Sequence, residues 1–205
     1  MVRLALESNS GLSHQLLSET ADVRERFQRN PLFARTFADL VEARVYRHLL
    51  GHLFSYFRLM EIMLSRCPKG GHHTLPEMVI NKSRWIERDL IILKSTPAPF
   101  PPLALMAPIQ NEADALGVSF FGEYLAWNSE VAEKHLQLAL PRACRKAVHF
   151  VQAYGRSREA QWQRFSHWLD HYPLPEDRDH SPVKAARKCF SGLDQWLSES
   201  ITHLG

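Results

Sequence analysis

Apolar residues recur at spacings of three to five positions between residues 113 and 136, in the segment ADALGVSFFGEYLAWNSEVAEKHL. This spacing predicts one long helix that buries most of one face against other helices. Glu123, Asn128 and Ser129 interrupt the apolar pattern in the middle of the segment. Polar residues in a buried helix indicate either contact with a ligand or, more commonly, a stripe that faces water. The periodicity alone leaves both interpretations open.

Helical periodicity also dominates the rest of the chain, and no segment shows the two-residue alternation of a strand. Asn30-Pro31, Gly70-Gly71 and the prolines between residues 97 and 108 separate the periodic segments. Helices are predicted at about residues 12–29, 32–37, 39–67, 75–93 with a break near Asn81, 113–136, 142–152 and 157–171, and a last one has Ser181 as its cap and Pro182 in its first turn. These elements predict an all-α protein with one domain over residues 1–205.

Composition narrows the class of protein further. A chain of 205 residues with 45% hydrophobic residues can bury a substantial core. The net charge is +3 and the basic residues are scattered, so nucleic acid is not expected as a partner. No segment approaches the roughly 20 apolar residues of a membrane span, and the N-terminus lacks the apolar core of a signal peptide. Cys67, Cys144 and Cys189 are far apart and fit buried thiols, so we expect a cytoplasmic protein with no membrane partner.

One pattern in the long predicted helix is similar to the distal-side helix of the heme oxygenases: Ala115-Leu116-Gly117, Phe120, Glu123, Val131 and His135-Leu136. Further residues agree with that family in the same order along the chain: Leu16, Thr20, Phe27, Pro31 to Arg35, Tyr46, Leu49, Leu50, Phe54, Tyr56, Glu61, Arg84, Asp89, Leu90, Leu93, Tyr154-Gly155, Trp162, Phe165 and Leu169. The chain therefore resembles the bacterial heme oxygenases over nearly its whole length.

This resemblance implies a heme oxygenase-like multi-helical bundle. It also implies heme as substrate or ligand, with oxidative opening of the ring to biliverdin, carbon monoxide and iron. An electron donor protein is implied as a partner of that reaction. No catalytic residue is assigned, because the sequence departs from the family pattern on both faces of the expected heme.

The first departure is at the proximal iron ligand. In the family a histidine on the first helix binds the iron, four residues after a threonine, and here Thr20 is followed four residues later by Arg24. A guanidinium group has five N–H donors and no lone pair, so Arg24 cannot coordinate iron as imidazole does. Two interpretations remain for Arg24. It pairs with a propionate or another acid group of a tetrapyrrole, or it is a surface arginine on a charged helix.

The second departure is on the distal side. A gapless alignment with the family places Asn128 and Ser129 where a glycine pair is expected, and Tyr124 where a glycine follows the glutamate. Glycine lets a backbone approach a ligand closely, whereas these side chains take up part of that space. The predicted ligand-binding residues are Thr20, Arg24, Glu123, Tyr124, Trp127, Asn128 and Ser129. The active site is therefore predicted to be degenerate.

Two histidines offer an alternative chemistry. His48 and His52 are four residues apart and so share one helix face, a spacing that zinc sites can use. Two more ligands would be needed, and the Glu-x-x-His motifs of diiron bundles are absent from the sequence. We assign both histidines to structure and predict no metal ligand among the protein side chains.

Three functional hypotheses follow. The first is a heme oxygenase that turns heme over. The second is a non-catalytic relative that binds heme or a linear tetrapyrrole (bilin) as a carrier or regulator. The third is an interaction protein in which Tyr124, Trp127 and Asn128 close the pocket.

Overall fold

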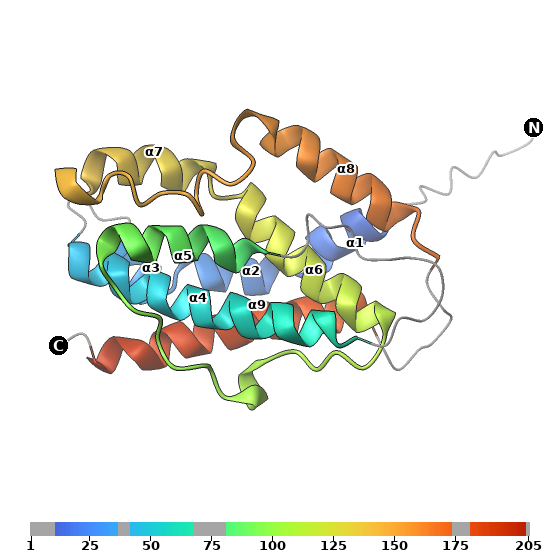
Figure 1. Ribbon diagram of the computed structural model, residues 1–205. Coiled ribbons are helices and arrows are strands. Elements are labelled where there is room, and N and C mark those ends of the chain that lie inside the picture. Colours follow the sequence, from blue (N-terminus) through green and yellow to red (C-terminus); the bar gives the residue numbers. More distant parts are fainter. Residues whose placement is uncertain (1–10, 37–41, 68–80, 174–180, 204–205) are drawn as a thin grey trace, which may run out of the picture.

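Helices make up all the regular structure in residues 11–36, 42–67, 81–173 and 181–203, which are the part of the chain that the computed structural model describes (Figure 1). The α-helices are α1 (Leu12–Glu19), α2 (Ala21–Gln28), α3 (Pro31–Thr36), α4 (Ala43–Ser65), α5 (Lys82–Leu93), α6 (Glu112–Trp127), α7 (Glu130–Ala139), α8 (Arg158–Asp170) and α9 (Pro182–Ser200). Short 3-10 helices are η2 (Leu103–Leu105), η3 (Arg142–Cys144), η4 (Gly155–Ser157) and η5 (Ile201–His203). The all-α prediction is confirmed.

Two predicted long helices are each split, which corrects the sequence analysis. The helix predicted at 12–29 divides into α1 and α2 at Thr20, whose hydroxyl donates to the carbonyl of Leu16 at 2.6 Å. The helix predicted at 113–136 divides into α6 and α7 at Asn128-Ser129, where the Ser129 hydroxyl donates to the carbonyl of Ala126 at 2.7 Å. Such side-chain bonds weaken a helix and often bend it. The same kind of bond from Ser119 to the carbonyl of Ala115 leaves α6 continuous, so the bond favours a break without requiring one. The spacing of apolar residues continues across both breaks, so it does not predict them.

The prediction of a helix at 142–152 is also wrong. Only the short η3 forms there, and turns follow it. The carboxylate of Asp89, on α5, accepts backbone N–H bonds from His149 at 2.7 Å and from Phe150 at 3.0 Å. These bonds satisfy donors that a helix would otherwise pair, so a distant residue fixes the local backbone.

Other boundaries agree with the prediction more closely. The predicted helix at 157–171 corresponds to α8, and Pro182 is the first residue of α9, although the Ser181 side chain makes no capping bond. Helix α5 begins after Asn81, which has a left-handed φ of 86°. The predicted stop at Gly70-Gly71 and the first part of the helix predicted at 75–93 lie outside the described residues.

Helix α9 packs against α6, α2, α1 and α4, and so joins early and late parts of the chain (Figure 1). Two glycines allow close packing on α9, one against α6 and the other against η2. A Cβ at Gly117 of α6 would lie 2.0 Å from the carbonyl oxygen of Pro182, and one at Gly192 of α9 would lie 1.8 Å from that of Leu105. Glycine is required at both positions because any side chain would overlap backbone atoms. In the described part of the chain no helix is both long enough and apolar enough to cross a membrane.

Candidate functional site

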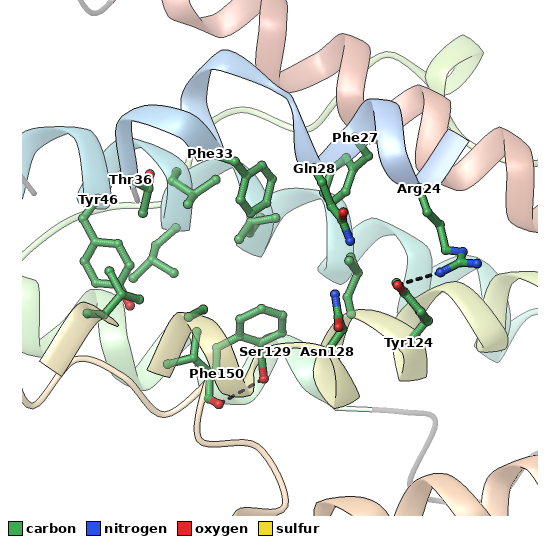
Figure 2. A pocket seen from close by; sticks show the side chains of 17 residues that line it. Arg24, Phe27, Gln28, Phe33, Thr36, Tyr46, Tyr124, Asn128, Ser129 and Phe150 are labelled. Carbon is green, nitrogen blue, oxygen red and sulfur yellow. Dashed lines mark hydrogen bonds between the residues drawn. The ribbon is translucent and has the colours of Figure 1, made fainter. Parts of the chain in front are cut away.

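A cavity of about 410 Å³ lies between two walls of the bundle. Helices α2, α3 and α4 form one wall, and α6, α7 and the segment around Phe150 form the other (Figure 2). Most of the lining is aliphatic or aromatic, and the polar lining residues are Arg24, Gln28, Thr36, Tyr46, Tyr124, Asn128 and Ser129. A mostly apolar cavity of this size with a few polar groups is typical of small-molecule sites.

Arg24 lies at one end of the cavity and is held by three acceptors. Its Nε donates to the Thr20 hydroxyl at 3.1 Å, one terminal nitrogen donates to the carbonyl of Leu17 at 2.5 Å, and the other donates to the Tyr124 hydroxyl at 2.7 Å. The break at Thr20 leaves carbonyls at the end of α1 without helical partners, so that of Leu17 can accept this bond. The side chain is partly buried, and these three contacts hold it at the cavity.

Tyr124 reaches towards α2 from the opposite wall. Its ring lies below the guanidinium group, with Cζ of Arg24 4.6 Å from the ring centroid. The ring also packs in an aromatic cluster with Phe190 at 5.7 Å, Phe120 at 6.0 Å and Trp162 at 6.3 Å between centroids. Only 5% of Tyr124 is exposed. The arginine and the tyrosine therefore form a fixed contact between α2 and α6 (Figure 2).

Two amides line the solvent-exposed side of the cavity. Gln28 of α2 and Asn128 of the turn between α6 and α7 are both exposed and point into the cavity from opposite walls (Figure 2). Each side-chain amide offers both N–H donors and a carbonyl acceptor. A ligand that enters here meets hydrogen-bonding groups before it meets the apolar interior.

The polar groups deeper in the cavity are satisfied by the protein itself. Thr36 donates to the carbonyl of Leu32 at 2.8 Å, and Tyr46 donates to that of Ala147 at 2.7 Å. The Ser129 hydroxyl is directed at backbone carbonyls, including that of Val151 at 3.0 Å. These residues therefore present mainly carbon atoms to a ligand.

The lining residues do not fit a heme whose iron is held by the protein. None of the described residues that line the cavity is a histidine, and Arg24 has no lone pair. Burial raises the pKa of Tyr46 well above its usual range, which disfavours the phenolate form that binds iron. The contact between Arg24 and Tyr124 also crosses the space between α2 and α6.

Thr20, Glu123 and Trp127 were predicted to bind the ligand, but they are not among the cavity-lining residues. Thr20 is buried behind Arg24 and orients it. The Trp127 ring stacks on Trp162 at 4.5 Å, and its N–H donates to Glu159 at 3.1 Å. A cavity remains beside Tyr124 and Asn128, so the three residues predicted to close the pocket do not fill it.

Glu123 faces a buried polar cluster instead of the cavity. Its carboxylate pairs with the ammonium group of Lys82 and accepts from the Tyr154 hydroxyl at 2.9 Å. Burial lowers the pKa of Lys82, and the nearby carboxylates of Glu123 and Glu61 partly offset that effect. Burial and the Glu123 charge raise the pKa of Tyr154. The glutamate therefore joins α5 to α6 within the core.

Four residues of the predicted set line the cavity, namely Arg24, Tyr124, Asn128 and Ser129. Their role towards a ligand stays a prediction. Gln28 was missed, although it lies four residues after Arg24 and so on the same helix face. Thr36 was missed because no motif marks it.

His48 and His52 lie away from this cavity. His48 hydrogen-bonds with the Ser200 hydroxyl at 3.0 Å, and the His52 ring packs on Trp196 at 5.1 Å, so both histidines connect α4 with α9. The described residues hold no group of three or more His, Cys, Asp or Glu side chains placed to bind one metal ion.

Comparison with known proteins supports the fold. No protein-family model matches the sequence, and no curated protein matches it. The NO- and CO-bound heme oxygenase from Neisseria meningitidis is similar in structure, with a TM-score of 0.69 at 15% identity over 94% of this chain and 92% of that chain. The heme complex of a heme oxygenase from the cyanobacterium Synechocystis gives a TM-score of 0.63 at 14% identity over 95% of this chain and 96% of that chain. The chain therefore has a heme oxygenase-like fold.

Proposed function

We propose that this protein binds a tetrapyrrole and does not open the ring of heme. The observation that carries the proposal is the contact between Arg24 and Tyr124, which stands where an iron ligand and an open distal face would be needed. Heme oxygenation requires iron held by the protein and space for oxygen above it. Arg24 has no lone pair for iron, and the Tyr124 ring takes up space that oxygen would need.

Binding without turnover is supported by the character of the cavity. Its walls are mainly apolar, and among its described lining residues only Arg24 carries a charge. The fork of a guanidinium group matches the geometry of a carboxylate, the group carried by the propionate arms of a tetrapyrrole. The Gln28 and Asn128 amides can pair with ring N–H and carbonyl groups at the exposed side. The solved structures with the same fold include a heme complex, which favours a tetrapyrrole as the ligand.

Heme oxygenase activity is the second candidate, because both similar structures are heme oxygenases. It would need an iron ligand from outside the described lining residues. A tetrapyrrole carrier or regulator needs only the cavity and its polar groups. We therefore place binding first.

Two titrations test the proposal. Absorbance is followed as biliverdin, and separately hemin, is added to the protein, and the hemin sample is then given a reductant and oxygen. We expect saturable one-to-one binding of biliverdin and no conversion of hemin to biliverdin. Conversion at a catalytic rate would establish the enzyme instead. No saturable binding of either compound would refute a tetrapyrrole site.

A matched pair of variants locates the site. Arg24→Met removes the cation in the cavity, whereas Arg26→Met removes a cation from the same helix that pairs with Asp194 outside it. We expect Arg24→Met to weaken biliverdin binding by about tenfold or more, the loss of one charge-assisted contact. Arg26→Met should bind as the unmodified protein does.

A further inference from the structure

Tyr124 joins the two walls of the cavity at one end. Its hydroxyl accepts from Arg24 at 2.7 Å, while the guanidinium carbon lies 4.6 Å from the centre of the tyrosine ring. Arg24 belongs to α2 and Tyr124 to α6, so the contact crosses the space between these helices (Figure 2). A flat molecule placed between the two helices at this point would therefore collide with the tyrosine ring.

The ring is not free to turn away. Phe120, Trp162 and Phe190 surround it, and only 5% of the residue is exposed. A move of Tyr124 out of the cavity would require these buried rings to repack, and closely packed interiors resist such changes. Tyr124 therefore acts as a rigid wall and not as a mobile gate.

The remaining cavity is limited in volume but open to solvent on one side. Its volume of about 410 Å³ lies in the lower part of the usual range for small-molecule sites. A closed tetrapyrrole is a rigid plane that has to fit between the two walls as one piece. An open-chain tetrapyrrole can rotate about the bonds between its rings, so it can place some rings among the apolar side chains and others beside Gln28 and Asn128.

We infer that Tyr124 determines specificity: it excludes closed, planar tetrapyrroles and admits an open-chain tetrapyrrole, one carboxylate of which is bound by Arg24. This inference rests on the proposed function and specifies its ligand. Arg24 can serve in this way because its three hydrogen bonds use three of the five guanidinium N–H groups. The Thr20 and Leu17 acceptors keep the guanidinium at the cavity when a carboxylate approaches.

Two ligands that differ in ring closure test the inference. Biliverdin is open, and protoporphyrin IX is closed, lacks a metal and carries the same two propionates. Binding is followed by absorbance and by quenching of tryptophan fluorescence, since Trp127 and Trp162 lie 5.9 and 6.3 Å from the Tyr124 ring. We expect the unmodified protein to bind biliverdin at least about tenfold more tightly than protoporphyrin IX. Equal affinities, or a preference for the closed ring, would overturn the inference while leaving a tetrapyrrole site in place.

Two substitutions separate the ring of Tyr124 from its hydroxyl. Tyr124→Leu keeps an apolar residue in α6 but removes the ring, so protoporphyrin IX should bind more tightly and the preference should fall by about tenfold or more. Tyr124→Phe keeps the ring, so the preference should persist. A preference that survives in the leucine variant, or disappears in the phenylalanine variant, would also overturn the inference. Failure of the unmodified protein to bind either compound would instead contradict the proposed function.

Discussion

At the scale of single residues, the buried charges of this protein are held by partners that are distant in sequence. Lys82 is fully buried, and its charge is compensated by Glu123, 41 residues away. Tyr154 donates to the same carboxylate at 2.9 Å. A buried charge without its partner is far more costly than the buried pair, so these residues depend on one another.

The buried pair leads to a prediction for stability. Lys82→Met leaves the Glu123 carboxylate without its ammonium partner, and we expect the free energy of unfolding to fall by about 3–5 kcal/mol. The double variant Lys82→Met, Glu123→Gln removes both charges and should be more stable than Lys82→Met alone. Denaturant unfolding of both single variants and the double variant measures this coupling. A double variant as unstable as the sum of the singles would show that the two groups do not interact.

At the scale of helices, hydroxyl-bearing residues stand at two helix breaks, and glycines set how closely helices pack. Thr20 and Ser129 each donate a hydroxyl hydrogen bond to a carbonyl in the preceding turn, and the helix breaks at that point. One break lies next to Arg24 and the other places Asn128 at the cavity. The two breaks thus shape the end and the opening of the site.

The packing of α6 on α9 gives a second prediction. Gly117→Ala places a Cβ 2.0 Å from the Pro182 carbonyl oxygen, which belongs to the backbone and cannot easily move. We expect a loss of roughly 1–3 kcal/mol of stability, as for other overpacked sites. Gly122→Ala, in the same helix, is the control. Its Cβ would meet the terminal methyl group of Met60 at 3.3 Å, so any cost is offset by the better helix propensity of alanine, about 1 kcal/mol. Equal losses in urea unfolding would contradict this account of the α6–α9 packing.

At the scale of the whole molecule, the cavity lies between two groups of helices. Its walls come from α2, α3 and α4 on one side and from α6 and α7 on the other. A ligand bound there contacts both walls, and the site that binds it exists only in the folded state. Ligand binding and folding stability are therefore thermodynamically linked.

This linkage gives a third prediction. Biliverdin at 100 times its dissociation constant should stabilise the protein by about 2.7 kcal/mol, which for a chain of this size corresponds to roughly 5–11 °C in Tm. The shift should be the same in Arg26→Met and about half as large or less at the same biliverdin concentration in Arg24→Met. A thermal melt followed by circular dichroism measures it. An equal shift in both variants would place the ligand away from Arg24.

Much of the fold and part of the site could be predicted from the sequence. The 3.6-residue periodicity determined the all-α class, because a helix that buries one face repeats its apolar residues at that spacing. Pro182 determined the start of α9, since its fixed φ and missing N–H suit a first helical turn. The identity of Arg24 determined that this position cannot coordinate iron, because a guanidinium group has no lone pair.

Only the tertiary structure decided which way the polar residues of α6 point. Nearly every residue of α6 is buried, so its pattern has no polar face from which the direction of Glu123 could be read. The partner that holds Glu123 is Lys82 on another helix, and the partner of Arg24 on the opposite wall is Tyr124, 100 positions further along the chain. Likewise, the chain forms turns where a helix was predicted at 142–152, because Asp89 accepts backbone hydrogen bonds from His149 and Phe150. Local spacing specifies which residues can share a face, but contacts between distant segments form only when the helices pack.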